Sequence, residues 1–312
     1  MTIASACGKI ILLGEHAVVY GRPALAAPLP ELRATAAASD LAEGEPGSVC
    51  IEAPDIELAA WLHELSPDQP LAVIVRLTRQ ALAIDKHPPL ALRVQSSIPV
   101  ASGLGSGTAV SVAVLRALSA HWGHPLAPER QSALAFEVEK LHHGTPSGID
   151  NTVVAYEQPV YFVRGDATQP FPIGAPFTLV LGDTGLRSNT SMAVGMVLQA
   201  WQAEKERFEA LFDRVAGTVA LGRKAIEQGD WATLGEAMDK NQQLLQEIGV
   251  SSDELETLIE TAKQAGALGA KLSGAGMGGN MIALVETEAA ADIEQALQNA
   301  GAAWTMTVEV GA

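Results

Sequence analysis

The sequence predicts a two-domain α+β protein. Its 312 residues exceed what a single small hydrophobic core usually holds, and the length favours about two domains. Strand-like and helix-like segments do not alternate regularly, so two α+β domains fit better than one doubly wound sheet. Periodicity lapses in the proline- and glycine-bearing stretch 165–176. We therefore predict an N-terminal domain over 1–172 and a C-terminal domain over 173–312.

The first half of the chain reads as strands mixed with helices. Apolar runs predict strands over 9–13 and 18–20, and alternating polarity predicts another over 90–95. Helical spacing of apolar residues predicts helices over 108–121 and 129–142.

The second half is richer in helix. A continuous apolar run predicts a buried strand over 177–181, and Ser251 with Glu254 predicts a capping box for a helix ending near 265. The remaining periodic segments predict helices over 190–228, 231–248 and 289–300, and strands over 281–285 and 304–310.

Composition narrows the function classes. Apolar residues make up 48% and charged residues 18%, which is ordinary for a globular protein. Thirty-six acidic against 20 basic residues give a net charge of −16, which argues against nucleic acid and membrane partners. Two cysteines cannot form a disulfide framework, and no apolar stretch is long enough to span a membrane. We expect a cytoplasmic protein.

A glycine-rich loop, PVASGLGSGTA, precedes the helix predicted from 108. Glycines let backbone amides approach a ligand, and a helix start presents free N–H groups to an anion, so the loop is either a phosphate cradle or a flexible turn. It fits neither the Rossmann fingerprint nor a Walker loop. The candidate nucleotide-binding residues are Pro99, Val100, Ala101, Ser102, Gly103, Leu104, Gly105, Ser106, Gly107, Thr108 and Ala109.

A second loop over 273–280, SGAGMGGN, lies between two strand-like segments. A tight hairpin turn needs only one or two glycines, so close backbone approach to a ligand explains four of them better. A glycine-rich crossing of the chain with itself is the alternative.

Polar residues outside these loops add weaker signals. Lys9 begins the first strand, Glu15 and His16 end it, and a turn at Pro146 and Gly148 presents Ser147 and Asp150. Glu139 lies on the preceding helix, so its carboxylate and that of Asp150 could converge on one cleft. Each feature alone is more simply structural, and only their convergence argues for a site.

The pattern as a whole resembles the GHMP family of small-molecule kinases. The blocks that carry the resemblance are GKIILLGEHAVVYGRPALA (8–26), PVASGLGSGTA (99–109), EKLHHGTPSGIDN (139–151), DTGLRSNTS (183–191) and KLSGAGMGGN (271–280). The first and third blocks narrow it to the branch of the family that phosphorylates mevalonate. The resemblance implies an N-terminal α/β domain with a left-handed crossover, a ferredoxin-like C-terminal domain, and an active site in the cleft between them.

The resemblance also implies roles for particular residues. ATP phosphates lie over 99–109, and Mg²⁺ is held by Glu139 and a hydroxyl of that loop. Asp150 is the catalytic aspartate facing the C5 hydroxyl of mevalonate, and Lys9 is its cationic partner. The loop over 273–280 closes an acceptor pocket lined by Glu15, His16, Ser147 and Thr190. A homodimer is expected as well.

One departure from the family pattern concerns the metal. The family loop usually reads GLGSS, and its second serine is a candidate ligand, but Gly107 occupies that position here. We expect the hydroxyl of Ser106 or Thr108 to take its place, directly or through water, because Mg²⁺ readily keeps several waters.

Phosphorylation of mevalonate at C5 by Mg-ATP, giving 5-phosphomevalonate and ADP, is therefore the predicted activity. The alternatives are a related kinase of the phosphomevalonate or homoserine type, or a non-catalytic metabolite sensor on the same fold. A mevalonate diphosphate decarboxylase fits less well, because its pattern does not match the TPSGID turn.

Overall fold

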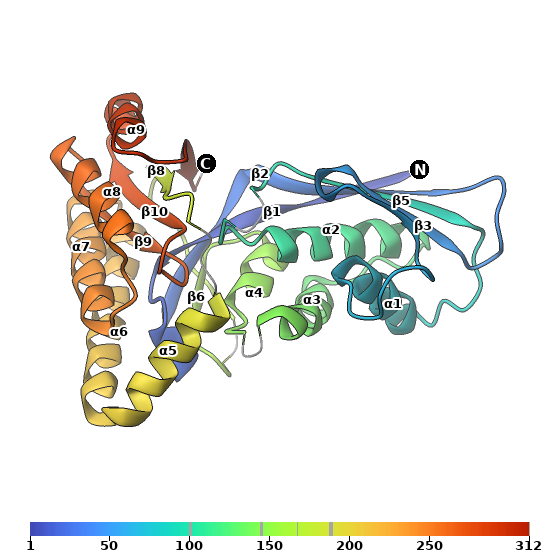
Figure 1. Cartoon of the computed structure of the whole chain (residues 1–312), viewed down its shortest axis with the longest axis horizontal. Coiled ribbons are helices and arrows are strands. Elements are labelled where there is room, and N and C mark those ends of the chain that lie inside the picture. Colours follow the sequence, from blue (N-terminus) through green and yellow to red (C-terminus); the bar gives the residue numbers. More distant parts are fainter. Residues whose placement is uncertain (100–101, 144–145, 167, 187–189, 312) are drawn as a thin grey trace. The chain divides into compact units, whose positions relative to one another are not determined.

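The computed structural model (Figure 1) describes the whole chain except residues 100–101, 144–145, 167, 187–189 and 312. It divides into two compact units, each built from segments that are distant in the sequence. Unit 1 comprises Met1–Gly8, Pro30–Val100 and Gly105–Glu157, and unit 2 comprises Lys9–Leu29, Ala101–Leu104 and Gln158–Ala312. Two long strands, β1 (Thr2–Leu13) and β2 (Ala24–Asp40), contribute residues to both units. A domain boundary at 172 and 173 stays a prediction.

Unit 1 contains a sheet in which the strands run in the order β4-β3-β5-β2. Its shorter strands are β3 (Val49–Ala53), β4 (Leu58–Trp61) and β5 (Leu90–Ser96). β5 is antiparallel to β2, whereas β3 and β5 are parallel. Parallel neighbours need a crossover connection, and the chain makes it through β4 and helix α1 (Pro70–Leu82).

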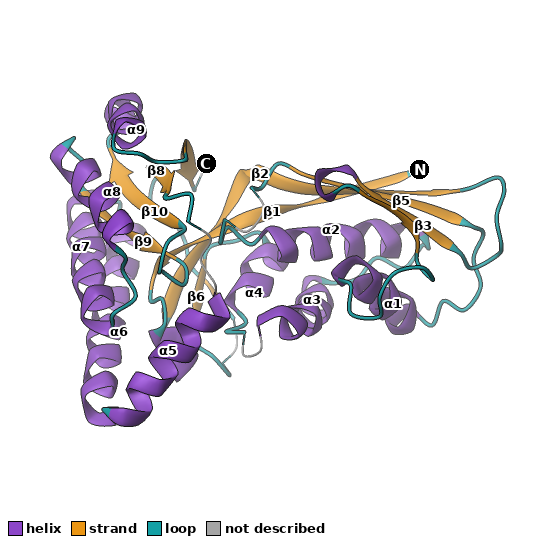
Figure 2. Cartoon of the chain, in the orientation of Figure 1, coloured by secondary structure: helices purple, strands orange, loops and turns teal. Residues whose placement is uncertain are grey.

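The α-helices of unit 1 lie on one side of its strands (Figure 2). After α1 they are α2 (Ser106–His121), α3 (Pro128–His143) and α4 (Ile149–Tyr156). α2 is the central one, because it packs against α1, α3, α4 and β5. Its core residues Val112, Val114, Leu115 and Leu118 are fully buried, so the start of α2 is held by a rigid apolar scaffold.

Unit 2 contains a four-stranded antiparallel sheet in the order β11-β8-β10-β9. Along the chain, β8 (Phe177–Asp183) is followed by helices, then β9 (Gly269–Ser273), β10 (Asn280–Val285), a further helix and β11 (Trp304–Val310). This order and topology are those of a ferredoxin-like sheet, as the family resemblance implies. The helices are α5 (Thr190–Ala203), α6 (Lys205–Gln228), α7 (Trp231–Ile248), α8 (Asp253–Gln264) and α9 (Ala290–Asn299).

The first part of β2 pairs, within unit 2, with the short strand β6 (Val160–Phe162), which pairs with β7 (Gln169–Pro170). Every residue of β8 and of β10 is buried, which explains why their sequences are almost continuously apolar. Helices α7, α8 and α9 pack against this sheet.

Most predicted elements are confirmed, and four predictions are corrected. The helical stretch predicted over 190–228 is two helices, α5 and α6, because Glu204 leaves the helical conformation between them, with φ −130°. The strand predicted over 18–20 is wrong: the segment is a 3-10 helix, η1 (Ala17–Tyr20), because positive φ angles at Gly14, His16 and Gly21 curl the chain. The capping box at Ser251 is also wrong, since Ser252 caps α8 by accepting a hydrogen bond from the Leu255 N–H. Asp150 lies in the first turn of α4 and not in the turn that precedes the helix.

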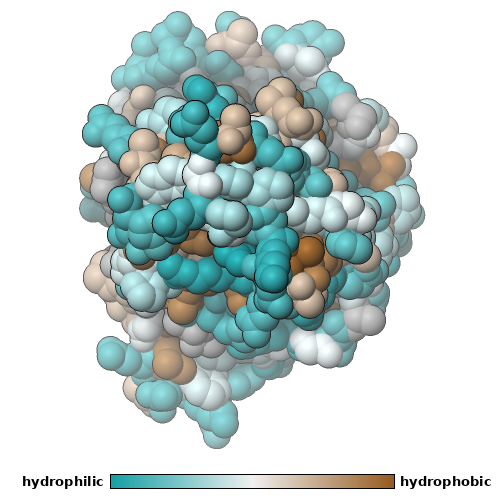
Figure 3. All heavy atoms as spheres, turned by 90° about the vertical axis from the view of Figure 1, so that its right-hand side faces the viewer, coloured by the Kyte–Doolittle hydropathy of each residue, from teal (hydrophilic) through white to brown (hydrophobic). Residues whose placement is uncertain are grey.

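The face drawn in Figure 3 is mainly hydrophilic, with small and separate apolar patches. This agrees with a chain that carries a net charge of −16. None of the helices in the described part of the chain has the combination of length and hydrophobicity that crossing a bilayer requires.

Candidate active site

The first candidate feature is the start of α2 in unit 1. Gly105 caps this helix in the left-handed conformation, with φ 76°, which a residue with a Cβ rarely adopts. Among the described residues, no atom beyond the chain neighbours and the helix's own backbone lies within 4 Å of where a Cβ of Gly107 would stand, so the backbone is open there, and the same holds for Gly103 in unit 2. The first-turn N–H groups of α2 are therefore available to an anion, as a phosphate cradle requires. Val100 and Ala101 lie outside the described residues.

A hydroxyl and a carboxylate meet beside this helix start. The Thr108 Oγ1 donates a hydrogen bond of 2.6 Å to the Glu139 Oε1, which joins α2 to α3. Thr108 is 7% exposed and Glu139 is 8% exposed. Hard oxygen ligands of this kind are what Mg²⁺ prefers, and Mg²⁺ commonly uses one or two protein carboxylates together with phosphates. The structure thus favours Thr108 over Ser106 as the partner of Glu139, and the role of Ser106 stays a prediction.

Asp150 is held by its neighbours in α4. Gly148 caps the helix with φ 92°, and the Ser147 hydroxyl accepts a hydrogen bond from the Ile149 N–H at 3.3 Å. The side-chain amide of Asn151 donates to the carbonyl and hydroxyl oxygens of Ser132 on α3, at 3.2 and 2.7 Å. Asp150 is therefore carried by a helix turn that is tied directly to the helix bearing Glu139.

Lys9 lies on β1 in unit 2 and is 3% exposed. Its backbone N–H donates to the Leu104 carbonyl oxygen at 2.9 Å, which attaches the strand to the first glycine loop. Asn280 makes a second attachment, because its side-chain amide donates to the Ser102 carbonyl oxygen. The two glycine loops identified in the sequence are thus joined within this unit. That Lys9 also meets Asp150 stays a prediction.

Glu15 forms a buried ion pair with Lys271, which the sequence did not predict. The Lys271 ammonium group, on β9, donates to the Glu15 Oε1 and to the Leu272 carbonyl oxygen. The side chains of Lys271 and Glu15 are 0% and 1% exposed. Burial lowers the pKa of Lys271, and the Glu15 carboxylate opposes this effect. In the sequence, Lys271 stands between Ala270 and Leu272 in a strand-like segment, which hints at a buried lysine but does not indicate its partner.

Asn241 on α7 completes this cluster. Its side-chain amide nitrogen donates to the other oxygen of Glu15 at 3.3 Å, and its Oδ1 accepts from the Thr218 hydroxyl at 3.2 Å and from the Gly14 N–H at 3.4 Å. The carboxylate of Glu15 is therefore occupied on both oxygens by side chains of unit 2. Its role as a lining residue of an acceptor pocket stays a prediction.

His16 has a defined protonation state. It is buried, and its Nε2 lies 2.9 Å from the Ala275 carbonyl oxygen. A carbonyl oxygen only accepts, so Nε2 carries the proton and the neutral ring keeps Nδ1 as an acceptor. Burial lowers the pKa of His16 below its ordinary value of 6.5, and the hydrogen bond to Ala275 opposes this. A neutral imidazole at this position can accept a hydrogen bond from a substrate hydroxyl.

The loop over 273–280 packs closely against other segments of unit 2. A Cβ at Gly276 would lie 2.1 Å from the Val250 carbonyl oxygen, and one at Gly278 would lie 2.9 Å from the Leu186 Cβ. At these two positions the glycines allow the chain to cross itself, which is the alternative that the sequence left open. Gly274 differs, because none of the described residues beyond its chain neighbours has an atom within 4 Å of its Cβ position. Thr190, the last predicted lining residue, is exposed at the first position of α5, and its role stays a prediction.

Comparison with known proteins gives two family matches. Residues 70–158 match the GHMP kinases N terminal domain, and residues 223–303 match the GHMP kinases C terminal model. Mevalonate kinase of Pyrococcus horikoshii is 36% identical, with 90% of this chain and 88% of that protein aligned. Mevalonate kinase of Aeropyrum pernix is also 36% identical, over 98% of this chain and 95% of that protein.

Among solved structures, L. major mevalonate kinase in complex with R-mevalonate superimposes with a TM-score of 0.85 at 29% sequence identity. The superposition covers 99% of this chain and 96% of that chain.

Proposed function

The chain belongs to the GHMP kinase family, among its mevalonate kinases, and on that premise we propose that it phosphorylates the C5 hydroxyl of (R)-mevalonate. The products are 5-phosphomevalonate and ADP, in the mevalonate route to isoprenoids. The observation that carries the proposal is the buried contact between Thr108 and Glu139 beside the glycine start of α2. This contact supports a nucleotide-phosphate site at the start of α2, in a chain that is about a third identical to mevalonate kinases over most of its length.

ATP is the phosphoryl donor, and its phosphates lie over residues 99–109 at the start of α2. The open backbone at Gly103 and Gly107 leaves room for phosphate oxygens beside the N–H groups. Glu139 and the Thr108 hydroxyl hold Mg²⁺, because their oxygens match its ligand preference. When bound, the ion neutralises negative charge on the phosphates.

Asp150 is the catalytic residue that faces the C5 hydroxyl, and Lys9 is its cationic partner. Phosphoryl transfer depends mainly on in-line positioning and on electrostatic stabilisation of the transferred group. The Asp150 carboxylate orients the attacking hydroxyl and accepts its proton, and the Lys9 ammonium stabilises the charge that develops.

The acceptor pocket is lined by Glu15, His16, Ser147 and Thr190, and the loop over 273–280 closes it. The neutral imidazole of His16 accepts a hydrogen bond from a mevalonate hydroxyl through Nδ1. Glu15 acts by fixing the backbone next to His16, because its carboxylate is held by Lys271 and Asn241.

The enzyme is a cytoplasmic homodimer with an N-terminal domain at 1–172 and a C-terminal domain at 173–312. The two cysteines are free thiols, as a reducing compartment favours.

Release of ADP by the purified protein tests the proposal. The protein is incubated with Mg-ATP and, in separate reactions, with (R)-mevalonate, phosphomevalonate and homoserine. We expect kcat/KM for mevalonate to exceed that for either other alcohol by at least about 100-fold, since a site built to hydrogen-bond one substrate rejects others strongly. Preference for phosphomevalonate or homoserine would assign another GHMP activity. Binding of ATP without turnover of any alcohol would indicate a metabolite sensor.

A further inference from the structure

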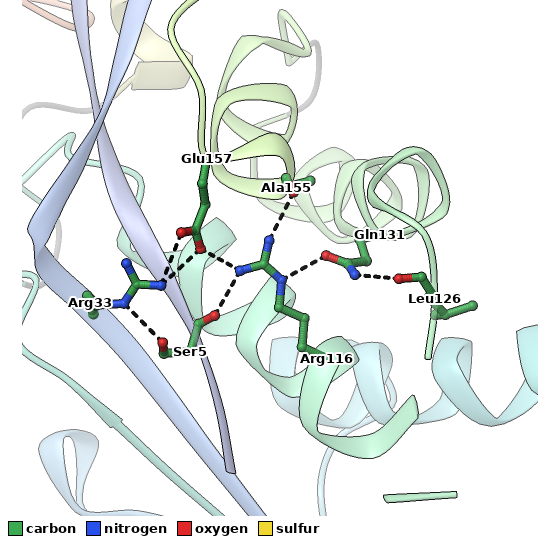
Figure 4. A network of polar contacts seen from close by, with 7 residues as sticks. All are labelled: Ser5, Arg33, Arg116, Leu126, Gln131, Ala155 and Glu157. Carbon is green, nitrogen blue, oxygen red and sulfur yellow. Dashed lines mark hydrogen bonds and ion pairs between the residues drawn. The ribbon is translucent and has the colours of Figure 1, made fainter. Parts of the chain in front are cut away.

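Arg116, near the middle of α2, contacts three other elements of unit 1 (Figure 4). One terminal nitrogen, Nη1, donates to the Ser5 carbonyl oxygen on β1 at 2.8 Å and to the Glu157 carboxylate. The other, Nη2, donates to the Ala155 carbonyl oxygen on α4 at 2.9 Å. Its Nε donates to the Gln131 Oε1 on α3 at 2.9 Å. One guanidinium thus joins α2 to β1, α3 and α4.

The partners of Arg116 are themselves held in place. The Gln131 side-chain amide donates to the Leu126 carbonyl oxygen at 2.6 Å, which fixes the orientation of its Oε1 toward Arg116. Glu157 is the C-cap of α4, with φ 49°, a left-handed conformation that is uncommon for a residue with a side chain. Its carboxylate also accepts two hydrogen bonds from the Arg33 Nη2, at 3.0 and 3.2 Å.

The three helices that meet at Arg116 are the ones that carry the proposed catalytic and metal-binding residues of unit 1. Arg116 follows Thr108 on α2 by about two helical turns, or about 12 Å, and Gln131 precedes Glu139 on α3 by the same interval. Ala155 follows Asp150 on α4 by about 8 Å. Arg116 therefore ties the same three helices together at a distance from their functional ends.

We propose that Arg116 is a positioning residue for phosphoryl transfer, which sets the relative placement of Thr108, Glu139 and Asp150 through α2, α3 and α4. The proposal rests on the proposed function of this site. A guanidinium holds its donors in a rigid planar fork, so partners bound to its different nitrogens keep a fixed relative geometry. Reactions that depend on alignment are sensitive to small displacements, and a shift of about 1 Å can cost about 100-fold in rate.

Arg33 offers a matched comparison. It binds the same Glu157 carboxylate and also the Ser5 hydroxyl, at 3.0 Å, but it projects from β2, and within the described part of the chain its side-chain hydrogen bonds reach neither α2 nor α3. The side chains of Arg33 and Arg116 are 34% and 21% exposed. Loss of either arginine removes part of the same network, but only loss of Arg116 removes the hydrogen bonds that join α2 to α3 and to α4.

The experiment compares Arg116→Lys with Arg33→Lys. We expect Arg116→Lys to lower kcat by about 10- to 100-fold, with KM for mevalonate and for ATP within about twofold of the parent values. Arg33→Lys should keep kcat within about twofold, although both variants lose thermal stability. A second measurement, hydrogen exchange of the α4 amides, should show faster exchange in Arg116→Lys than in Arg33→Lys.

Equal losses of kcat in the two variants, or unchanged kcat in Arg116→Lys, would overturn the proposal. If Arg116→Lys fails to fold, two variants of Gln131 take its place. Gln131→Met removes the acceptor of the Arg116 Nε, whereas Gln131→Glu keeps an acceptor there. Only Gln131→Met should then lower kcat. Failure of the proposed function is recognised separately, because the parent protein would then leave mevalonate unphosphorylated. The exchange measurement would still decide whether Arg116 holds α4.

Discussion

The hydroxyl of Thr108 donates a hydrogen bond of 2.6 Å to the carboxylate of Glu139, and both residues are less than a tenth exposed. A carboxylate removed from water needs partners that offset its lost hydration. The Thr108 hydroxyl supplies one such partner, from the first turn of the adjacent helix α2. The contact joins one of the two candidate hydroxyls of the glycine loop to the carboxylate, and the role of either hydroxyl toward a metal stays a prediction.

Replacing Thr108 by valine should raise the Mg²⁺ concentration needed for half-maximal activity and lower kcat by about 10- to 100-fold, because the oxygen proposed to hold Mg²⁺ is lost while the shape of the side chain is kept. Ser106→Ala should change both quantities by less than about threefold, and Thr108→Ser should retain activity. A titration of initial rate against Mg²⁺ measures the effect. The reverse order of sensitivity would assign the metal role to Ser106.

Breaking the buried pair of Lys271 and Glu15 should destabilise the protein strongly. Lys271→Met or Glu15→Gln alone leaves one buried group without its partner, and each should cost about 3–5 kcal/mol. The double variant should cost clearly less than the sum of the two. Urea unfolding at pH 7 measures this, with the exposed pair Arg214–Glu247 as a control whose removal changes little. Additive losses would show that the two groups do not stabilise each other.

The lowered pKa of His16 predicts a pH dependence of stability. In the unfolded chain His16 titrates near 6.5, and burial lowers its pKa in the folded protein. Between these two values the unfolded state binds more protons, so stability is highest above pH 6.5 and falls as the pH drops below it. Thermal unfolding between pH 7.5 and 5 should therefore show a steeper loss for the parent protein than for His16→Gln. Parallel curves would mean that His16 is not buried in its neutral form.

The loop over 273–280 allows two glycines with positive φ to be compared. Gly276→Ala places a Cβ against the Val250 carbonyl oxygen, whereas Gly274→Ala meets only the backbone strain of its own φ of 104°. We expect Gly276→Ala to destabilise by more than about 2 kcal/mol, and Gly274→Ala by about 1 kcal/mol. Equal effects in a denaturant titration would show that the crossing with Val250 relaxes easily.

Periodicity and local chemistry predicted much of the fold. The ends of α7 and β11 lie where the sequence places them, and the ferredoxin-like order of β8, β9, β10 and β11 agrees with the resemblance. The segment 18–20 could not be predicted correctly, because its conformation depends on a positive φ at His16, which is rare for a residue with a side chain.

The contacts that fix the site were less accessible from sequence. Lys271 and Glu15 are far apart along the chain, and nothing in their local patterns indicates that they pair. The same holds for Arg116, whose partners come from three other elements. Residues that contact substrate stand out as motifs, while residues that hold them in place are recognised only when distant segments are brought together.

The measurement that tests the account most directly is a double-mutant cycle on Lys9 and Asp150, read as kcat for ADP release with mevalonate and Mg-ATP. Asp150→Asn should lower kcat by at least about 1,000-fold, because it removes both the proton acceptor and the charge. If both groups act on one phosphoryl group, introducing Lys9→Met into the Asp150→Asn variant should lower kcat by no more than about a further tenfold. The reason is that the effects of substituting residues that act as a unit are not additive. Fully multiplicative losses, or only a mild loss in Asp150→Asn, would contradict the account.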